Sequence, residues 1–243
     1  MPEVPAMLAN VMEPWFARAT RVTGVEDLAP RLKRVRFEGG SLRGLRFRAG
    51  QEVEFRVSET AFRHYTPSFF DGVAGALEVV FFLHGHGPGS HWASGLREGS
   101  TANVLGPGGK LGLDPFAATH VLLGDETSIG LFAAMGRSLP PGSRAVGAVE
   151  LDAGCERWPG LAGSALDGVA RGKGPRGAPL RTWLEEHPAW LEPRRAQKGD
   201  TTFYLSGHAG SIVELRRWLV EERGIPKGAI RTKAYWADGK RGL

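Results

Sequence analysis

Two short segments in the first half of the chain combine residue types that bind a planar ring and a phosphate. Residues 63–67 place a cation, an aromatic ring and a hydroxyl close together, and on a strand Arg63 and Tyr65 share one face. Residues 84–92 are rich in glycine and include Ser90 and Trp92, and backbone N–H groups with a serine hydroxyl suit a phosphate. Each segment alone is also compatible with a tight turn beside a core aromatic residue, but both together favour a binding site.

Two segments in the second half, 124–128 and 206–211, follow predicted strands. Open α/β sheets bind ligands beyond the carboxyl ends of their strands, and a helix that begins after residue 206 would offer N–H groups to a phosphate. Neither segment contains the full G-x-G-x-x-G fingerprint. A P-loop is excluded as well, because Val104 and Leu111 stand where that motif around Lys110 needs glycine and a hydroxyl.

Other chemistries find less support in the sequence. His84, His86 and His91 are potential metal ligands, but no Asp or Glu lies between Glu78 and Glu98, so we expect no metal site. A serine hydrolase is disfavoured because the chain lacks G-x-S-x-G. The single cysteine excludes a disulfide framework, a cysteine zinc finger and a cysteine-ligated iron–sulfur cluster. Electron transfer would therefore need an organic cofactor.

The first half of the chain reads as short strands separated by turn signals. This pattern is typical of an antiparallel barrel or sandwich, and the Gly/Pro run at 85–90 is interpreted as a break, with no helix in this half. The predicted strands are 17–25, 32–38, 52–57, 77–83 and 101–105.

From about residue 116 strands and helices alternate, which predicts a parallel sheet covered by helices. The predicted strands are 120–123, 144–151, 201–205 and 229–236, with one helix ending before Pro140. A second helix is predicted to begin with a capping box formed by Ser211 and Glu214. We therefore expect a β-barrel domain over residues 1–115 and an α/β domain over residues 116–243.

One basic, Gly/Pro-rich segment lies between the predicted strands of the second half. Residues 168–179 contain Arg171, Lys173 and Arg176 and are either a solvated loop or a mobile flap over a bound anion. The net charge of +5 suits an anionic ligand, but no stripe of clustered Lys and Arg with aromatic partners supports a barrel that binds nucleic acid.

The sequence also bears on location. Residues 1–15 contain no Lys or Arg and do not resemble a signal peptide, and the longest apolar stretch, 77–83, is far short of a membrane span. We expect a cytoplasmic protein with no membrane partner.

Six motifs in chain order resemble those of the siderophore-interacting proteins, which are FAD-containing, NAD(P)H-dependent ferric-siderophore reductases of the ferredoxin-reductase-like superfamily. The resemblance covers roughly residues 17–238. It implies an N-terminal antiparallel β-barrel flavin domain followed by a Rossmann-like α/β nucleotide-binding domain. The motifs are Arg63-x-Tyr65-Thr66, Leu83-His84-Gly85-x-Gly87-Pro88-x-Ser90-x-Trp92, Gly106-Pro107-Gly108-Gly109, Gly124-Asp125-Glu126-Thr127, Ser206-Gly207-x-Ala209-Gly210 and Lys233-x-Tyr235-Trp236.

The resemblance also implies a role for each matching position. Arg63, Tyr65 and Thr66 would hold the flavin, with Tyr65 against its ring and Thr66 near its reactive nitrogen, so that Tyr65 and Thr66 are the candidate catalytic residues. The pyrophosphate would lie on His84, Gly85, Gly87, Pro88, Ser90 and Trp92, and Asp125, Glu126 and Thr127 would lie where the second domain meets the flavin. NADPH or NADH would bind at Ser206, Gly207, Ala209 and Gly210, and an anionic ferric siderophore would face Lys233, Lys240 and Arg241.

The chain departs from the family pattern at a few positions. Ser68 and Phe69 stand where members often have arginine, and His86 and His208 stand where they often have Asp and Glu. Because His208 lies in the expected nucleotide segment, an alternative is a flavin- or siderophore-binding protein served by a separate electron donor. The sequence is compatible with a monomer.

Overall fold

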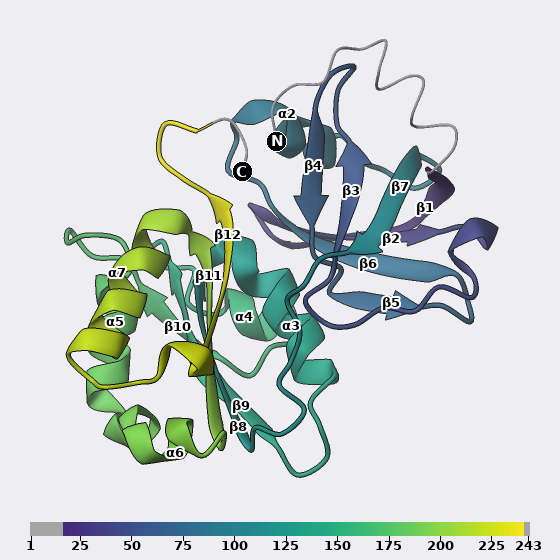
Figure 1. Ribbon diagram of the computed structural model, residues 1–243. Helices are drawn as coiled ribbons and strands as arrows, with labels where there is room; N and C mark the ends of the chain where they lie inside the picture. The colour runs from purple at the N-terminus through teal and green to yellow at the C-terminus, as the bar shows by residue number, and fades with distance from the viewer. Residues whose placement is uncertain (1–16, 241–243) are drawn as a thin grey trace. The chain divides into compact units, whose positions relative to one another are not determined.

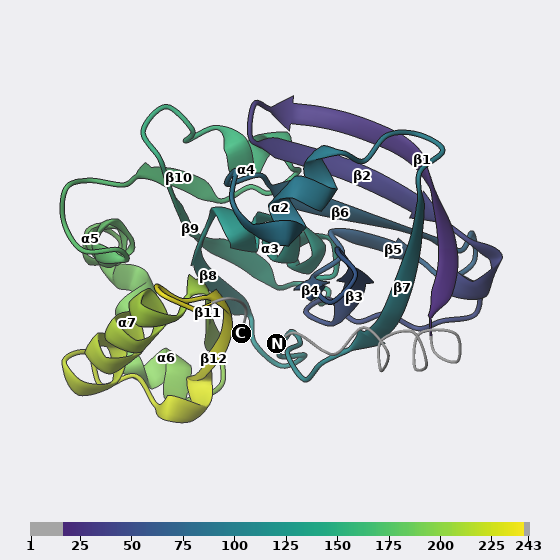
Figure 2. The ribbon, with the colours of Figure 1, turned by 90° about the horizontal axis from the view of Figure 1, so that it is seen from above.

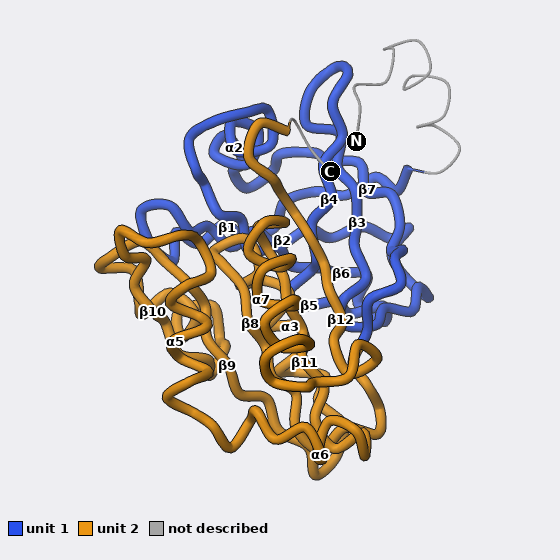
Figure 3. The backbone as a smooth tube through the Cα atoms, turned by 60° about the vertical axis from the view of Figure 1, so that its left-hand side comes forward, with its two compact units in different colours: residues 1–112, 242 blue, residues 113–241, 243 orange. Residues whose placement is uncertain are grey.

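The computed structural model of the chain describes residues 17–240 (Figure 1). These residues divide into two compact units, with unit 1 ending at Gly112 and unit 2 beginning at Leu113 (Figure 3). The sequence predicts the change from antiparallel to alternating structure close to this point, near residue 116. Each unit has its own sheet.

Unit 1 contains one seven-stranded sheet whose pairings are all antiparallel. The predicted antiparallel fold of this half is therefore confirmed. The strand order is β4-β3-β7-β1-β2-β6-β5. The strands are β1 (Arg18–Ala29), β2 (Leu32–Glu38), β3 (Glu52–Arg56), β4 (Phe62–Tyr65), β5 (Phe69–Asp71), β6 (Ala76–Phe82) and β7 (Thr101–Gly108), with a short 3-10 turn, η1 (Gly40–Leu42).

The core of unit 1 is built from the inward faces of these strands. Phe37 of β2, Phe55 of β3 and Phe81 of β6 are almost completely buried. The ring centroids of Phe37 and Phe55 are 5.0 Å apart, and those of Phe37 and Phe81 are 6.5 Å apart. Alternation along each strand sends these rings to one face, so that they form a single apolar cluster.

A helix interrupts unit 1 where the sequence predicts none. Helix α2 spans Gly87–Ser94, with Pro88 in its first turn, where a missing N–H costs nothing. The prediction was wrong because glycine and proline dominate the local signal, whereas tertiary contacts decide the structure. Trp92 stacks on Phe37 at 6.5 Å, and the buried Lys33 donates from Nζ to the Ser94 carbonyl at 3.0 Å.

Unit 2 contains a five-stranded sheet of order β10-β9-β8-β11-β12, and all its pairings are parallel. The predicted α/β fold is confirmed. The strands are β8 (Thr119–Asp125), β9 (Arg144–Leu151), β10 (Asp167–Ala170), β11 (Thr201–His208) and β12 (Ile230–Trp236). The helices are α3 (Ile129–Arg137), α4 (Trp158–Leu161), α5 (Ala178–Glu186), α6 (Pro193–Gln197) and α7 (Ala209–Glu221), with 3-10 turns η2 (Glu126–Ser128), η3 (Pro188–Leu191) and η4 (Lys227–Ala229).

The strand order places a topological switch point at the carboxyl ends of β8 and β11. From β8 the chain moves outward to β9 and β10, and then returns to place β11 on the opposite side of β8. The connections that leave β8 and β11 therefore diverge, and ligands of open α/β sheets bind at such a switch point. The carboxyl ends of these two strands are Asp125 and His208.

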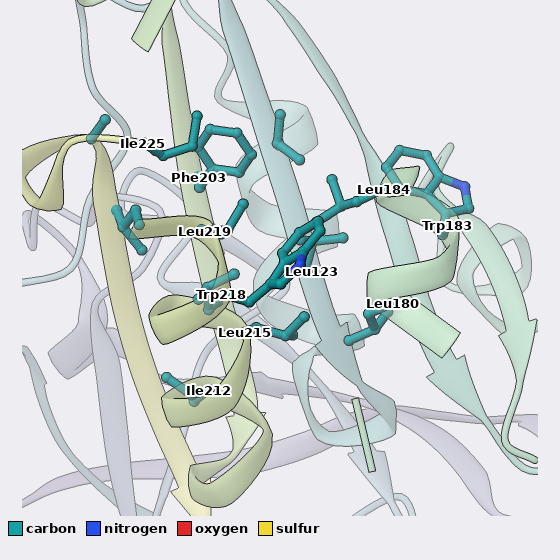
Figure 4. Close-up of a cluster of buried hydrophobic side chains, with 14 of the residues drawn as sticks. Leu123, Leu180, Trp183, Leu184, Phe203, Ile212, Leu215, Trp218, Leu219 and Ile225 are labelled. Atoms are coloured by element: carbon teal, nitrogen blue, oxygen red, sulfur yellow. The ribbon is translucent and has the colours of Figure 1, made fainter. Parts of the chain in front are cut away.

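Helices cover both faces of the sheet, with α5 and α7 on one side and α3 on the other (Figures 1 and 2). Figure 4 shows the larger cluster, in which side chains of α5 and α7 meet Leu123 of β8 and Phe203 of β11. Trp183 and Trp218 are the largest members of this cluster. It holds the helix that begins at the switch point firmly against the sheet.

Among residues 17–240, none of the helices combines the length and the apolar character that crossing a membrane requires.

Candidate functional site

In unit 1 the segments 63–67 and 84–92 lie against each other. A Cβ atom on Gly89, in the first turns of α2, would lie 2.6 Å from Tyr65 Oη and 3.2 Å from Arg63 Cγ. Real Cβ atoms essentially never come as close as 2.6 Å to another atom, so with Tyr65 in this position glycine is what lets the helix approach β4 so closely. The structure therefore brings Arg63, Tyr65 and the N-terminal part of α2 together.

Tyr65 has a fixed ring and a neutral hydroxyl. Its ring packs edge-on against Phe81, with 4.7 Å between centroids. Burial raises the pKa of Tyr65 to about 12, while the charge of Arg63 acts in the opposite direction. The hydroxyl therefore keeps its proton at neutral pH and can donate it in a hydrogen bond. Thr66 follows directly and is 6% exposed.

The loop before α2 offers backbone groups to a ligand. Gly85 and Gly87 have φ angles of 82° and 71°, and a Cβ on either would meet no atom within 4 Å. The Gly85 N–H donates to Ser90 Oγ at 3.0 Å, which leaves the hydroxyl hydrogen of Ser90 for another acceptor. The side chain of His86 does not cap the helix. This open backbone at a helix N-terminus fits the pyrophosphate of a dinucleotide.

The histidines and the indole beside this loop have different surroundings. Burial lowers the pKa of His84, and the charges of His86 and His91 lower it further, so the His84 imidazole is neutral at neutral pH. No group of three or more His, Cys, Asp or Glu residues within the described part of the chain is arranged to hold a metal ion. Trp92 contacts Phe55 at 5.1 Å in addition to Phe37 and so anchors α2 to the core.

In unit 2 a single buried carboxylate joins the ends of three strands. Asp125 Oδ1 accepts from the Thr127 backbone N–H at 3.0 Å and from the Thr127 hydroxyl. Asp125 Oδ2 accepts from the His208 backbone N–H at 2.8 Å and from Trp236 Nε1 at 2.9 Å. Burial raises the pKa of Asp125, and these four donors act against that increase. Both oxygens are occupied, so Asp125 positions the surrounding groups.

Gly207 makes this arrangement possible. Its φ is 106°, and a Cβ atom here would lie 2.4 Å from Asp125 Cγ. The adjacent Ser206 lies opposite Lys233 in the register of β11 and β12. Ser206 is 5% exposed, and its Oγ has no hydrogen-bond partner among the described residues. It lines a pocket together with Asp125, His208 and Ser211, so an acceptor or donor from a ligand can complete its bonding.

Helix α7 begins at this pocket, but the predicted capping box is wrong. Strand β11 continues to His208, three residues beyond the predicted end, so Ser211 already lies within the helix. The N-cap is His208, whose Nδ1 accepts from the Ser211 N–H at 3.2 Å. Nδ1 must therefore be unprotonated, and Nε2 faces Asp238 at 3.3 Å. Ala209 and Gly210 form the first turn of α7.

A partly buried ionic cluster, which the sequence does not predict, lies beside this pocket. Arg171 contacts Glu126, Glu150 and Asp152 at 2.8, 3.0 and 2.6 Å. Burial acts to lower the pKa of Arg171, but hydrogen bonds and charges of Glu126 and Glu150 raise it above its ordinary value. The basic composition of 168–179 was the only sequence signal, because the three carboxylates come from other segments.

The predicted siderophore-facing cations are described only in part. The Lys233 Nζ lies 5.8 Å from the centre of the Tyr235 ring, and Lys240 is exposed. Arg241 lies outside the described residues. The structure does not bring Lys233 and Lys240 together through any contact that it shows.

Comparison with known families gives two matches that together cover most of both units. Residues 54–111 match the siderophore-interacting FAD-binding domain, and residues 117–239 match the siderophore-interacting protein family. The first range contains β4 and α2, and the second contains the strand ends around Asp125.

The chain is also similar to individual proteins. The chain is 32% identical to the uncharacterized protein Rv2895c of Mycobacterium tuberculosis over 73% of its own length and 65% of that protein. It thus spans about 65% of the length of this relative. It is 24% identical to the ferric vibriobactin reductase ViuB of Vibrio cholerae over 81% of this chain and 72% of that protein.

A solved structure, a siderophore utilization protein from T. fusca, is also similar to the chain. It superposes with a TM-score of 0.76 at 27% identity, covering 93% of this chain and 95% of that one.

Replacing Asp125 by Asn tests the carboxylate that joins the strand ends. The amide nitrogen would face two of the four donors, and leaving buried donors unsatisfied should lower the free energy of unfolding by about 2 kcal/mol. Urea unfolding followed by circular dichroism measures this change. Asp238→Asn is the matched control, because its carboxylate is 77% exposed and its loss should change the stability by less than about 0.5 kcal/mol. Equal stability of Asp125→Asn and the wild-type protein would show that Asp125 does not hold the strand ends.

Proposed function

The chain belongs to the siderophore-interacting protein family, and from this premise we propose that it is a flavin-dependent oxidoreductase that passes electrons from NAD(P)H through FAD to a ferric siderophore. The observation that carries the proposal is the close packing of α2 on Arg63 and Tyr65, within the range that matches the FAD-binding domain. That packing supports a platform for an aromatic ring beside an open helix N-terminus.

Each group in unit 1 has a defined task in this proposal. Tyr65 offers an aromatic surface and a neutral hydroxyl donor, and Arg63 adds a positive charge to the same strand face. The backbone N–H groups before and within the first turn of α2, together with the Ser90 hydroxyl, would bind the pyrophosphate. Thr66 would lie near the reactive part of the flavin. When bound, FAD supplies hydride acceptance and single-electron donation.

Unit 2 would hold the nicotinamide nucleotide at the carboxyl ends of β8 and β11. Asp125 fixes the backbone at His208 and the indole of Trp236, which pre-organises the edge of the pocket. The buried Ser206 hydroxyl lacks a partner among the described residues and would take one from the nucleotide. These residues orient ligands, and the redox chemistry requires no general acid or base from the chain.

The substrate would be an anionic ferric chelate. Hard oxygen ligands hold Fe(III) more tightly than Fe(II), so reduction loosens the iron. The net charge of +5 favours an anionic substrate. We assign Lys233, Lys240 and Arg241 to its approach, which follows the family resemblance.

A flavoprotein with a separate electron donor is the second candidate. The observation that favours it is His208, whose ring caps α7 within the segment assigned to the nucleotide. In that case the chain would still bind the flavin and the ferric siderophore, and only the electron donor would differ.

Tyr65→Ala tests the flavin platform. Loss of the aromatic surface should lower the flavin content of the purified protein at least severalfold, whereas Tyr65→Phe should retain most of it. Flavin absorbance per protein gives the content, and circular dichroism verifies folding, because Tyr65 also contacts Phe81. Full flavin content in a folded Tyr65→Ala protein would place the ring elsewhere.

The delivery of electrons to iron is tested without a nicotinamide nucleotide. The flavin-loaded protein is reduced by dithionite under anaerobic conditions, freed of excess reductant and mixed with a ferric tris-catechol complex. The flavin should be reoxidised while Fe(II) appears in a ferrozine trap, at two Fe(II) per flavin by electron balance. A flavin that stays reduced would contradict the proposed substrate class.

A further inference from the structure

The pocket of unit 2 has two arginines in its wall, and both come from the connection between β10 and α5. Arg171 and Arg176 line it together with Asp125, Ser206, His208 and Ser211. Two guanidinium groups therefore lie at one edge of the sheet. The surroundings of the two side chains differ.

The guanidinium nitrogens of Arg171 all donate hydrogen bonds within the protein. Its three nitrogens contact one carboxylate oxygen each of Glu126, Glu150 and Asp152. Its side chain is 18% exposed, and the three negative charges outweigh its own. A ligand anion would gain little from this guanidinium, because its charge and its donors are already engaged.

Glu150 fixes the connection at both ends. Its Oε1 accepts from Arg171 Nε at 3.0 Å, and its Oε2 accepts from the Gly177 N–H at 2.6 Å. Glu150 is 2% exposed, so this carboxylate anchors the segment from inside the unit. The connection is thus anchored at Arg171 and at Gly177, while residues 172–176 between these two anchors are exposed.

Arg176 lies within this wall without a carboxylate partner among the described residues. Its guanidinium lies 4.8 Å from the centre of the Trp236 ring, and Asp125 fixes that indole through Nε1. A guanidinium stacked on an aromatic face keeps the N–H groups at its edge available for an anion. Arg176 is exposed, so a ligand can reach it.

Two further features of the pocket point to the same kind of ligand. The N-terminus of the 13-residue helix α7 lies at the pocket with Ser211 in its first turn. Ser206 lines the same pocket and is only 5% exposed. Its hydroxyl has no hydrogen-bond partner among the described residues. A cation, a helix N-terminus and an unsatisfied hydroxyl together suit a phosphate oxygen.

We propose that Arg176 binds a phosphate group of the nicotinamide nucleotide and is the residue of this pocket that sets nucleotide affinity. The identity of the ligand rests on the proposed function. A phosphate has two sources here, the pyrophosphate that NAD⁺ and NADP⁺ share and the ribose phosphate that only NADP⁺ carries. The guanidinium already lies over the Trp236 ring, and this contact lowers the side-chain entropy that is lost on binding.

Isothermal titration of the full-length protein with NADP⁺, NAD⁺ and inorganic pyrophosphate tests this assignment. Arg176→Gln should weaken the binding of at least one probe by roughly tenfold or more, because a charge-assisted hydrogen bond is lost. Lys173→Gln is the matched control, since it removes the same charge from the same connection at an exposed residue outside the pocket wall. Arg176→Lys keeps the charge but loses the forked set of N–H donors, so its affinity should lie between those of the wild-type protein and Arg176→Gln.

The three probes identify the source of the phosphate. Weakening of NADP⁺ alone assigns Arg176 to the ribose phosphate, and equal weakening of both nucleotides assigns it to the pyrophosphate. The wild-type protein could instead bind pyrophosphate, with a loss in Arg176→Gln, and bind neither nucleotide. That result would support Arg176 as a phosphate-binding residue and would contradict direct electron donation by a nicotinamide nucleotide.

The assignment is overturned if Arg176→Gln and Lys173→Gln bind every probe equally well, or if the wild-type protein binds none of the three. An unchanged melting temperature of Arg176→Gln shows that any loss of binding is local.

Discussion

The proposed nucleotide-binding edge of unit 2 depends on one buried carboxylate whose two oxygens accept four hydrogen bonds. Asp125 accepts four hydrogen bonds and so connects the end of β8 with the ends of β11 and β12. The indole that it holds supports Arg176, and the backbone that it holds presents the His208 ring as the cap of α7. The close approach requires glycine at position 207. Most features of the proposed nucleotide pocket follow from this single group.

In unit 1, too, a glycine allows two elements to approach closely, and buried side chains hold them together. Gly89 lets α2 approach Tyr65 and Arg63, and Trp92 and Lys33 fix the helix from the core and from its carboxyl end. In both units a glycine stands where two elements meet and a buried polar or aromatic group holds them. Rigid elements thus position the groups that we propose to bind ligands, and such rigidity would hold the proposed flavin and nucleotide in defined orientations.

The sequence carries much of this information, but unevenly. Strands 32–38 and 144–151 agree with their predicted bounds because glycine, proline and other turn residues flank them closely. Helix α2 could not be predicted, because its stability comes from distant aromatic rings. The same holds for the anchoring of Arg171, whose three carboxylate partners come from η2, from β9 and from the residue that follows β9. The N-cap His208 is hidden because the extent of β11 depends on its pairing with β12.

The central claim is that the bound flavin receives its electrons directly from a nicotinamide nucleotide. Anaerobic stopped-flow mixing of the oxidised, flavin-loaded protein with NADH and, separately, with NADPH tests it most directly. We expect the yellow absorbance of the flavin to bleach with at least one nucleotide, at a rate that saturates with nucleotide concentration. Absence of bleaching with both nucleotides, in a protein whose flavin dithionite does reduce, would contradict direct donation and favour a separate electron donor.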